Sequence, residues 1–264
     1  MTILSDAEVR RLSDELLAAE RERRPVVPLS ERFPGLTQEQ AYAIQLRTIQ
    51  SRVDAGARIV GVKVAFTNRS IQQEFGMGEP AAGMLFDSRT FSDGAVVPFD
   101  SLTQAMVEPE IGCVLGEDLE GPGVTVAMAL QALAGVMPAI EIVDLRFRDW
   151  KVTGPDVTAD SDGGWGVVLG GQLTPVQGLD LRLVGCVLMK NGQIVSTGAG
   201  AAALGSPAGV VAWVANKLSA LGLGGLRRGQ VVITGSLTKS EIISRGDGFT
   251  ALYDRLGSVS VSFR

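Results

Sequence analysis

The sequence is best interpreted outward from Met106-Val107-Glu108-Pro109-Glu110-Ile111-Gly112-Cys113-Val114-Leu115. This stretch has the composition of a β-strand, and side chains alternate between the two faces of a strand. Glu108 and Glu110 therefore share a face, with Cβ atoms about 7 Å apart, while the other face is apolar: Val107, Pro109, Ile111, Cys113 and Leu115. Two such carboxylates are half of a divalent cation site, although a solvated polar face is the more ordinary interpretation. Pro109 has no N–H to donate and predicts an edge or a bulge.

The absence of histidine restricts the chemistry of this chain. None of the 264 residues is histidine. Ser-His-Asp and Cys-His arrangements, imidazole-ligated zinc and histidine general bases are therefore excluded. Chemistry on carboxylates, lysine, Ser/Thr, a hard metal ion or a bound cofactor remains, and carboxylate oxygens suit Mg²⁺, Mn²⁺ or Ca²⁺.

Length and composition predict one large globular unit, with residues 1–58 as an N-terminal helical segment packed on a main domain of residues 59–264. Apolar residues are 45% and charged residues 20%, as in ordinary globular proteins. The net charge of -5, without a Lys/Arg block, argues against a nucleic-acid partner. Cys113 and Cys186 lie in apolar runs and are expected to be buried thiols of a cytoplasmic protein.

One stretch could imitate a membrane span. Residues 121–140 carry no charge, but they include Pro122 and Pro138 and are rich in alanine and glycine. We expect a buried helix followed by a strand there, and no membrane partner. The N-terminus turns polar too early for a signal peptide, which also favours the cytoplasm.

Local signals divide the chain into helices and strands. Ser5 with Glu8, and Thr37 with Gln40, form capping boxes that predict helices running to about Glu22 and to Gly56. Further helices are expected near residues 126–136, ended by Pro138, and from Pro207 through Leu218 to a close at Gly222. A loop with a flexible hinge is expected over residues 156–165. Strands are expected over 59–66, 84–86, 95–98, 106–115, 139–144, 183–189, 193–197, 231–233, 249–253 and 259–263.

Two charged residues interrupt apolar strands. Lys63 lies in the strand from Ile59, where it either snorkels from an edge strand or serves a site. Glu141 lies in Ala139-Ile140-Glu141-Ile142-Val143-Asp144, where a buried acid is costly unless it is paired or ligates a metal. It is thus a candidate third ligand, with an ion pair to Arg146 or Lys151 as the alternative.

A series of short motifs carries a resemblance that spans most of the chain. The motifs are Gly61-Val62-Lys63-Val64, Glu108-Pro109-Glu110-Ile111, Ile140-Glu141-Ile142-Val143-Asp144, Asp149-Trp150-Lys151, Ala159-Asp160, Lys190-Asn191-Gly192, Thr197-Gly198-Ala199-Gly200, Gly205-Ser206-Pro207, Thr234-Gly235-Ser236-Leu237-Thr238 and Leu256-Gly257-Ser258-Val259. In this order they resemble the fumarylacetoacetate hydrolase superfamily, in its branch of 2-keto-4-pentenoate hydratases and 4-oxalocrotonate decarboxylases. The resemblance implies an α+β fold, a mixed β-sandwich roll with peripheral and N-terminal helices, and a homo-oligomer.

The resemblance also implies a site. It implies Mg²⁺ or Mn²⁺ held by Glu108, Glu110 and Glu141, with Lys63 reaching the substrate beside the metal. Asp160 and Glu79 are candidates for moving protons, and the candidate substrate contacts are Thr67, Asn68, Ser161 and Ser236. The runs around residues 121–125, 149–151 and 196–207 look more like the hydratase. That enzyme ketonises a 2-hydroxy-2,4-dienoate and adds water at C4 to give a 4-hydroxy-2-oxo acid.

Three alternatives remain open at this point. A decarboxylase would use the same metal and enolate on a 2-oxo-dioate, a hydrolase would cleave an acylpyruvate-like C–C bond but lacks its histidine base here, and a diverged paralogue would bind a 2-oxo acid without turnover. Departures from the family pattern motivate the last alternative: Asn68 replaces a serine, Ala81 and Ala82 replace an acid and an aromatic residue, and Ser161-Asp162-Gly163 replaces Asn-Ala-Ser. We therefore predict an intact metal site with altered substrate contacts.

Overall fold

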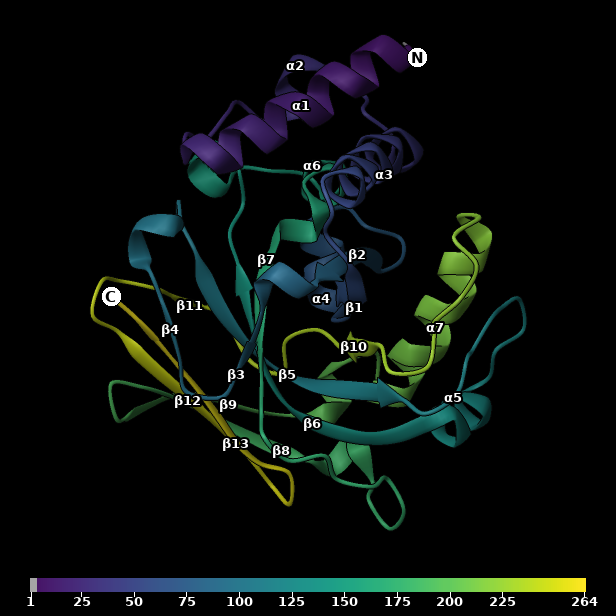
Figure 1. Cartoon of the computed structure of the whole chain (residues 1–264), viewed down its shortest axis with the longest axis vertical. Helices are drawn as coiled ribbons and strands as arrows, with labels where there is room; N and C mark the ends of the chain where they lie inside the picture. Colours follow the sequence, from purple (N-terminus) through teal and green to yellow (C-terminus); the bar gives the residue numbers. More distant parts are fainter. Residues whose placement is uncertain (1–3) are drawn as a thin grey trace.

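The computed structural model of the protein describes residues 4–264 and contains two β-sheets with helices around them (Figure 1). The helices are α1 Asp6–Glu22, α2 Leu29–Arg32, α3 Gln38–Asp54, α4 Arg69–Glu74, α5 Val126–Ala132, α6 Gly154–Ala159 and α7 Pro207–Ala220. The strands are β1 Ile59–Ala65, β2 Ala81–Phe86, β3 Thr90–Ser92, β4 Ala95–Val97, β5 Met106–Leu115, β6 Leu133–Val143, β7 Gly164–Leu169, β8 Gly185–Lys190, β9 Gln193–Ala199, β10 Val231–Ile233, β11 Glu241–Ile242, β12 Gly248–Tyr253 and β13 Gly257–Phe263. This architecture confirms the expected mixed α+β fold.

The larger sheet runs in the order β2-β1-β10-β5-β6-β7-β3, and the smaller in the order β4-β13-β12-β8-β9. The apolar face of β5 belongs to one core with residues of the smaller sheet, among them Phe249 and Phe263. Because side chains alternate along a strand, this packing turns the acidic face of β5 to the other side of the larger sheet. Cys113 and Cys186 are buried free thiols in that core, as expected.

Pro109 lies in β5 at a gap between two neighbouring strands. One side of β5 pairs with β6 along its whole length, whereas the other side pairs with β10 over residues 112–114 and with β11 over residues 106–107. Between these two short partners, the Leu237 N–H donates to the Pro109 carbonyl over 2.9 Å. The expectation of an edge or a bulge is therefore wrong: β5 is an interior strand, and Pro109 is tolerated because its missing donor faces a break between two short partner strands.

The segment after Thr125 departs from its prediction. Helix α5 ends at Ala132, four residues earlier than expected, and Pro138 lies within β6 opposite Ile111. Long antiparallel pairing with β5 overrides the helical preference of the alanine-rich run. Pro138 lies just past the end of the β6–β7 ladder, where its carbonyl accepts from the Gly170 N–H. The proline is tolerated because the ladder needs no N–H from residue 138.

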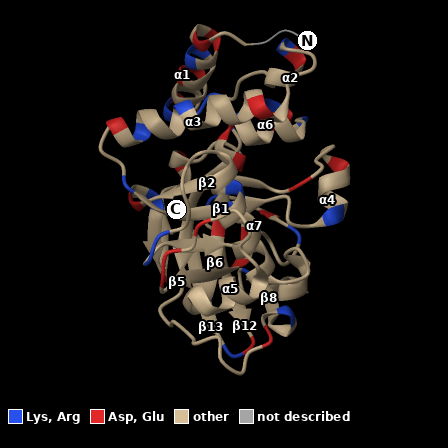
Figure 2. Ribbon diagram, turned by 90° about the vertical axis from the view of Figure 1, so that its right-hand side faces the viewer, with Lys and Arg blue, Asp and Glu red and all other residues tan. Residues whose placement is uncertain are grey.

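Helices α1, α2, α3 and α6 lie together at one end of the molecule, away from the smaller sheet (Figures 1 and 2). Both predicted capping boxes are present. The apolar sides of α1 and α3 bury Leu12, Leu16 and Ile44 against Phe147, which follows β6. No helix among residues 4–264 is long and apolar enough to cross a membrane.

Residues 156–165 are more ordered than the predicted loop and hinge. They form the end of α6, a 3₁₀ turn over Ser161–Gly163 and the start of β7. Their three acids are buried: Asp156 accepts from the backbone N–H and hydroxyl of Ser30, and Asp160 pairs with Arg146. Long-range polar partners, invisible to a local reading, hold this segment in place.

Candidate active site

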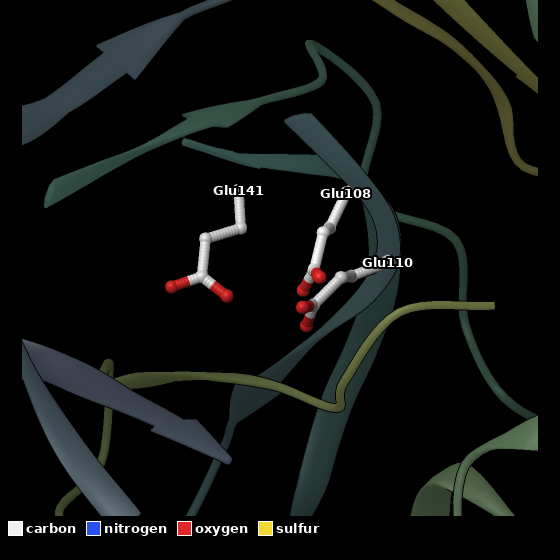
Figure 3. Close-up of side chains that lie close together, drawn as sticks. All are labelled: Glu108, Glu110 and Glu141. Atoms are coloured by element: carbon white, nitrogen blue, oxygen red, sulfur yellow. The ribbon is translucent and has the colours of Figure 1, made fainter. Parts of the chain in front are cut away.

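Three glutamates meet on the face of the larger sheet that is turned away from the core. Glu108 on β5 lies directly opposite Glu141 on β6, and Glu110 follows two residues along the same face. One carboxylate oxygen from each lies within 4.8 Å of the others. Figure 3 shows the three carboxylates turned toward a common space. The structure thus brings together the three predicted metal ligands, and the strand register explains why Glu141 joins the pair on β5.

The loop after β10 holds two of these carboxylates. The Gly235 N–H donates to Glu110 Oε2 over 2.7 Å, and the Ser240 hydroxyl donates to Glu108 Oε1. Glu110 Oε1 is buried and has no hydrogen-bond donor. A buried carboxylate oxygen without a partner is costly, so it is a free acceptor directed at the common space.

Lys63 supplies the nearest positive charge. Its Nζ lies 2.8 Å from Glu141 Oε1 and donates to the Asp162 carbonyl over 2.6 Å. The side chain is buried, and β1 lies between β2 and β10. The alternative of a lysine snorkelling from an edge strand is therefore wrong.

The charges of the cluster do not balance. Burial raises the pKa of Glu110 well above its usual range, and the neighbouring Glu141 and Glu108 raise it further. Burial also raises the pKa of Glu141, although Lys63 opposes that shift. Burial lowers the pKa of Lys63, but Glu141, Asp162 and Glu108 together outweigh it and raise the pKa. Three carboxylates against one ammonium form an oxygen-rich, acidic donor set that fits a hard divalent cation.

A cavity of about 610 Å³ opens beside the glutamates. Its polar lining includes Lys63, Thr67, Asn68, Glu108, Asp162 and Ser236. Three of the four predicted substrate contacts therefore line it. Asn68 is exposed and caps α4 by accepting from the Ser70 N–H, whereas the Ser236 hydroxyl donates within its own loop to the Thr238 carbonyl.

Other predicted site residues lie apart from this cavity. The Asp160 carboxylate receives hydrogen bonds from the Arg146 backbone N–H and guanidinium, with Nε at 2.6 Å from Oδ1. Glu79 is exposed and pairs with Lys217 over 2.7 Å. Ser161 is buried and lines a second, smaller pocket together with Trp165. None of the three is among the residues that line the cavity.

Asp162 is the acid that the structure places in the cavity instead. It is 2% exposed, and its Oδ1 has no hydrogen-bond partner. Burial raises its pKa to about 7, against the opposing effect of Lys63. Ser161 and Asp162 both have left-handed φ angles, near 55°, which are unfavourable for residues other than glycine and cluster at functional sites. The departure from the family pattern at Ser161-Asp162-Gly163 is the signal that could have identified it.

The sequence also missed the residues that support Asp162. Gln45 of α3 donates from Nε2 to Asp162 Oδ2 over 3.1 Å and to the Thr158 carbonyl over 3.0 Å. Gly83 of β2 leaves room for this carboxylate, because a Cβ there would lie 3.3 Å from Asp162 Oδ2 and 2.9 Å from the Ser161 carbonyl oxygen. No local pattern links positions so far apart in the chain.

The fold and this glutamate cluster place the chain in a known family. Residues 58–264 match the fumarylacetoacetate (FAA) hydrolase C-terminal family, and the chain belongs to it. It is 40% identical to a 2-keto-4-pentenoate hydratase of Paraburkholderia xenovorans, over 95% of this chain and 93% of the relative. It is 36% identical to a 2-hydroxyhexa-2,4-dienoate hydratase of Comamonas testosteroni, over 98% and 99% of the two chains.

Among solved structures, the fold matches 4-oxalocrotonate decarboxylase from Pseudomonas putida G7 complexed with magnesium and adipate. The TM-score is 0.96 and the identity 32%, with both chains fully covered. These relatives agree with the branch indicated by the sequence. The hydratases are the more similar in sequence, and the decarboxylase structure matches the fold over the whole chain.

Proposed function

We propose that this protein is a divalent-metal-dependent hydro-lyase that converts a 2-hydroxy-2,4-dienoate into a 4-hydroxy-2-oxo acid. The observation that carries the proposal is the cluster of Glu108, Glu110 and Glu141, with Lys63 beside it; Glu108 and Lys63 line the cavity. Similarity to several hydratases supports the reaction class. The proposal includes Mg²⁺ or Mn²⁺ as the cofactor and a homo-oligomer in the cytoplasm, without a nucleic-acid or membrane partner.

The three glutamates are the proposed ligands. Glu110 Oε1 lacks a donor, and burial together with mutual repulsion raises the pKa of Glu110 and Glu141, so the cluster is electrostatically incomplete on its own. A divalent cation bound there would act as a Lewis acid that polarises the oxygens of a 2-oxo acid and stabilises enolate charge. The chain contributes the geometry, because strand pairing and the Gly235 loop fix the carboxylates before a cation arrives.

Lys63 is proposed to contact the substrate oxygen at C2. Its ammonium group is held between Glu141 and the Asp162 carbonyl, so its position is fixed before substrate binds. A fixed positive charge in a buried site stabilises a developing oxyanion without reorganisation of solvent. Thr67, Asn68 and Ser236 line the same cavity and are proposed as further substrate contacts.

Asp162 is proposed as the group that moves protons, in the place first expected for Asp160 or Glu79. Asp160 is occupied by Arg146 and Glu79 by Lys217, whereas one oxygen of Asp162 is free. A carboxyl with a pKa of about 7 can both give and accept a proton near neutral pH.

The reaction balances with water alone. Ketonisation removes the proton of the C2 hydroxyl and delivers a proton to C5, which leaves a C3=C4 double bond conjugated with the C2 ketone. Water then adds across that bond, with its oxygen at C4 and a proton at C3. The product is the 4-hydroxy-2-oxo acid, and no oxidant or second substrate is consumed.

The test follows the ultraviolet absorbance of freshly generated 2-hydroxypenta-2,4-dienoate with purified protein, with and without Mg²⁺ or Mn²⁺. We expect metal-dependent loss of the diene and formation of 4-hydroxy-2-oxopentanoate. Glu108→Gln should abolish it, whereas the exposed Glu117→Gln is the matched control. No turnover, or metal binding by the native protein no tighter than by the Glu108→Gln and Glu110→Gln double variant, would contradict the proposal.

The decarboxylase remains the second candidate because of the closely similar fold. The same charge cluster would stabilise the enolate left after loss of CO₂ from a 2-oxo-dioate. Product analysis separates the two activities, since only decarboxylation releases CO₂.

A further inference from the structure

The turn that carries Asp162 is held by two buried cations. Lys63 lines the cavity and donates to the Asp162 carbonyl over 2.6 Å. Arg146, which follows β6, is 3% exposed and is not among the residues that line the cavity. Each cation is also paired with a buried acid, Lys63 with Glu141 and Arg146 with Asp160. Only Lys63 has been given a role so far.

The guanidinium group of Arg146 reaches both ends of this turn at once. Its Nη2 donates to the Asp160 carbonyl, which precedes the turn, and its Nη1 lies 3.4 Å from the Gly164 carbonyl, which follows it. Nε donates to Asp160 Oδ1 over 2.6 Å, and Nη1 also donates to the Asp144 carbonyl over 2.8 Å. All three nitrogens of the side chain are therefore engaged by the protein.

The backbone beside Arg146 holds the same turn. The Arg146 N–H donates to Asp160 Oδ2 over 2.7 Å, and the Asp144 N–H donates to the Gly163 carbonyl over 2.8 Å. The carbonyls of residues 160, 162, 163 and 164 thus each accept from Lys63 or from the segment of residues 144–146. Few backbone groups of the turn are left to move independently.

This restraint matters because the turn is strained. Ser161 and Asp162 have φ angles of 55° and 54°. Such conformations persist in residues other than glycine only when the surrounding structure over-determines them. A lysine at position 146 would keep the positive charge, but its ammonium is a single point and does not match the spacing of carbonyls at both ends of the turn.

We propose that Arg146 is a positioning residue for the reaction: its guanidinium clamps the turn and thereby sets both the Asp162 carboxylate and the ammonium group of Lys63. This inference rests on the proposed hydratase function and deepens it. Arg146 acts without contact to the proposed metal ligands, because within residues 4–264 its side chain bonds to other groups: Glu20, Asp144, Asp160 and Gly164.

The experiment compares Arg146→Lys with the same substitution at Arg52. Arg52 on α3 shares the carboxylate of Glu20 with Arg146, but its own contacts are to Glu20 and to the ring of Phe86. In Arg146→Lys, kcat for 2-hydroxypenta-2,4-dienoate should fall about 10- to 100-fold, as expected when a catalytic group is slightly displaced. Affinity for Mn²⁺ should stay unchanged, and the pH profile of kcat should move.

Arg52→Lys should leave both kcat and its pH profile as in the native protein. A loss of stability alone lowers the amount of folded protein and does not move that profile. Native kcat and pH profile in Arg146→Lys, or an equal fall of kcat in both variants, would overturn the inference while the hydratase function stands.

A double variant tests the clamp if Arg146→Lys fails to fold. Arg146→Gln combined with Asp160→Asn removes both charges of the buried pair, so no unpaired charge is left between them. Glu20 keeps Arg52 and Arg89 as partners. The double variant should stay folded and show the same fall in kcat, and native kcat in it would refute the clamp.

Hydrogen exchange reports on the clamp without turnover. The amides of Asp144, Arg146 and Gly163, which bond within or to the turn, should exchange faster in Arg146→Lys and at the native rate in Arg52→Lys. Faster exchange in Arg146→Lys, together with failure of the native protein to hydrate any dienoate, would refute the hydratase function and support the clamp. Unchanged exchange would refute the clamp whatever the activity.

Discussion

Gln45 of α3 donates to the carboxylate of Asp162 over 3.1 Å, although 117 residues separate them in the chain. Both side chains are buried. Helix α3 thus contacts an acid that lines the cavity and orients the carboxylate proposed to move protons. The same amide group also donates to the Thr158 carbonyl, so it connects the turn of Asp162 to the end of α6.

Gln45→Ala should lower activity through the position of Asp162. Removal of a buried hydrogen bond to a carboxyl group costs about 1–3 kcal/mol, which corresponds to a decrease in kcat of about five- to 150-fold if the contact is made in the transition state. The control is Gln50→Ala, because Gln50 is exposed on the same helix and bonds only to Asp54 one turn away. A merely structural role would lower the melting temperature without moving the pH profile of kcat, so the measurement is kcat against pH for both variants.

The two neighbouring acids should respond differently to amidation. Asp160→Asn removes the nearest counter-charge of the buried Arg146 guanidinium and leaves it only the more distant Glu20, at 3.9 Å, which should cost about 3 kcal/mol of unfolding free energy. Asp162→Asn should instead abolish turnover in a protein that stays folded. Denaturant unfolding and steady-state kinetics on both variants check this separation, and loss of activity only in the Asp160 variant would reverse the assignment.

The raised pKa of Asp162 gives its contribution to stability a definite sign. Burial raises that pKa from the ordinary value of 3.8 to about 7, so between these pH values the folded state binds a proton that the unfolded state has released. Stability from this group is fully present below about pH 4 and is lost as the pH rises through 7. Asp162→Asn should therefore gain stability relative to the native protein between pH 4 and pH 8. Unfolding free energies at several pH values measure this gain, with the exposed Asp93→Asn as control; a gap between native protein and variant that stays constant with pH would contradict it.

The strand that carries the glutamates and the helix caps were predictable because each depends on local alternation or spacing. Glu141 was also predictable, since an acid in so apolar a strand needs a partner. Local alternation and spacing give no role to Asp162, because it enters the cavity through a strained turn held by Gln45 from another helix; only the departure from the family pattern marks it. The end of α5 was misplaced for a similar reason: pairing of β6 with β5 decides it, and that pairing is long-range.

Gly235 is the position where backbone and site are most tightly joined. Its φ is +90°, a Cβ there would lie 2.0 Å from Thr67 Oγ1, and its N–H donates to Glu110. Gly235→Ala must therefore shift the loop, which removes that donor from the proposed metal ligand. We expect divalent metal binding to weaken at least tenfold. Overpacking should also lower the unfolding free energy by about 1–3 kcal/mol, in addition to the cost of backbone strain.

Gly229→Ala is the matched control for this substitution. Gly229 has a similar φ of +84°, but nothing lies within 4 Å of the Cβ that it would gain. Gly229→Ala should lose about 1–2 kcal/mol of unfolding free energy from its left-handed backbone, without disturbing Thr67 or Glu110. Calorimetric titration of both variants with Mn²⁺ separates backbone strain from displacement of the Gly235 loop. Backbone strain lowers the stability of both variants but leaves their metal affinity unchanged. Equal metal affinity in the two variants would show that the Gly235 loop does not position Glu110.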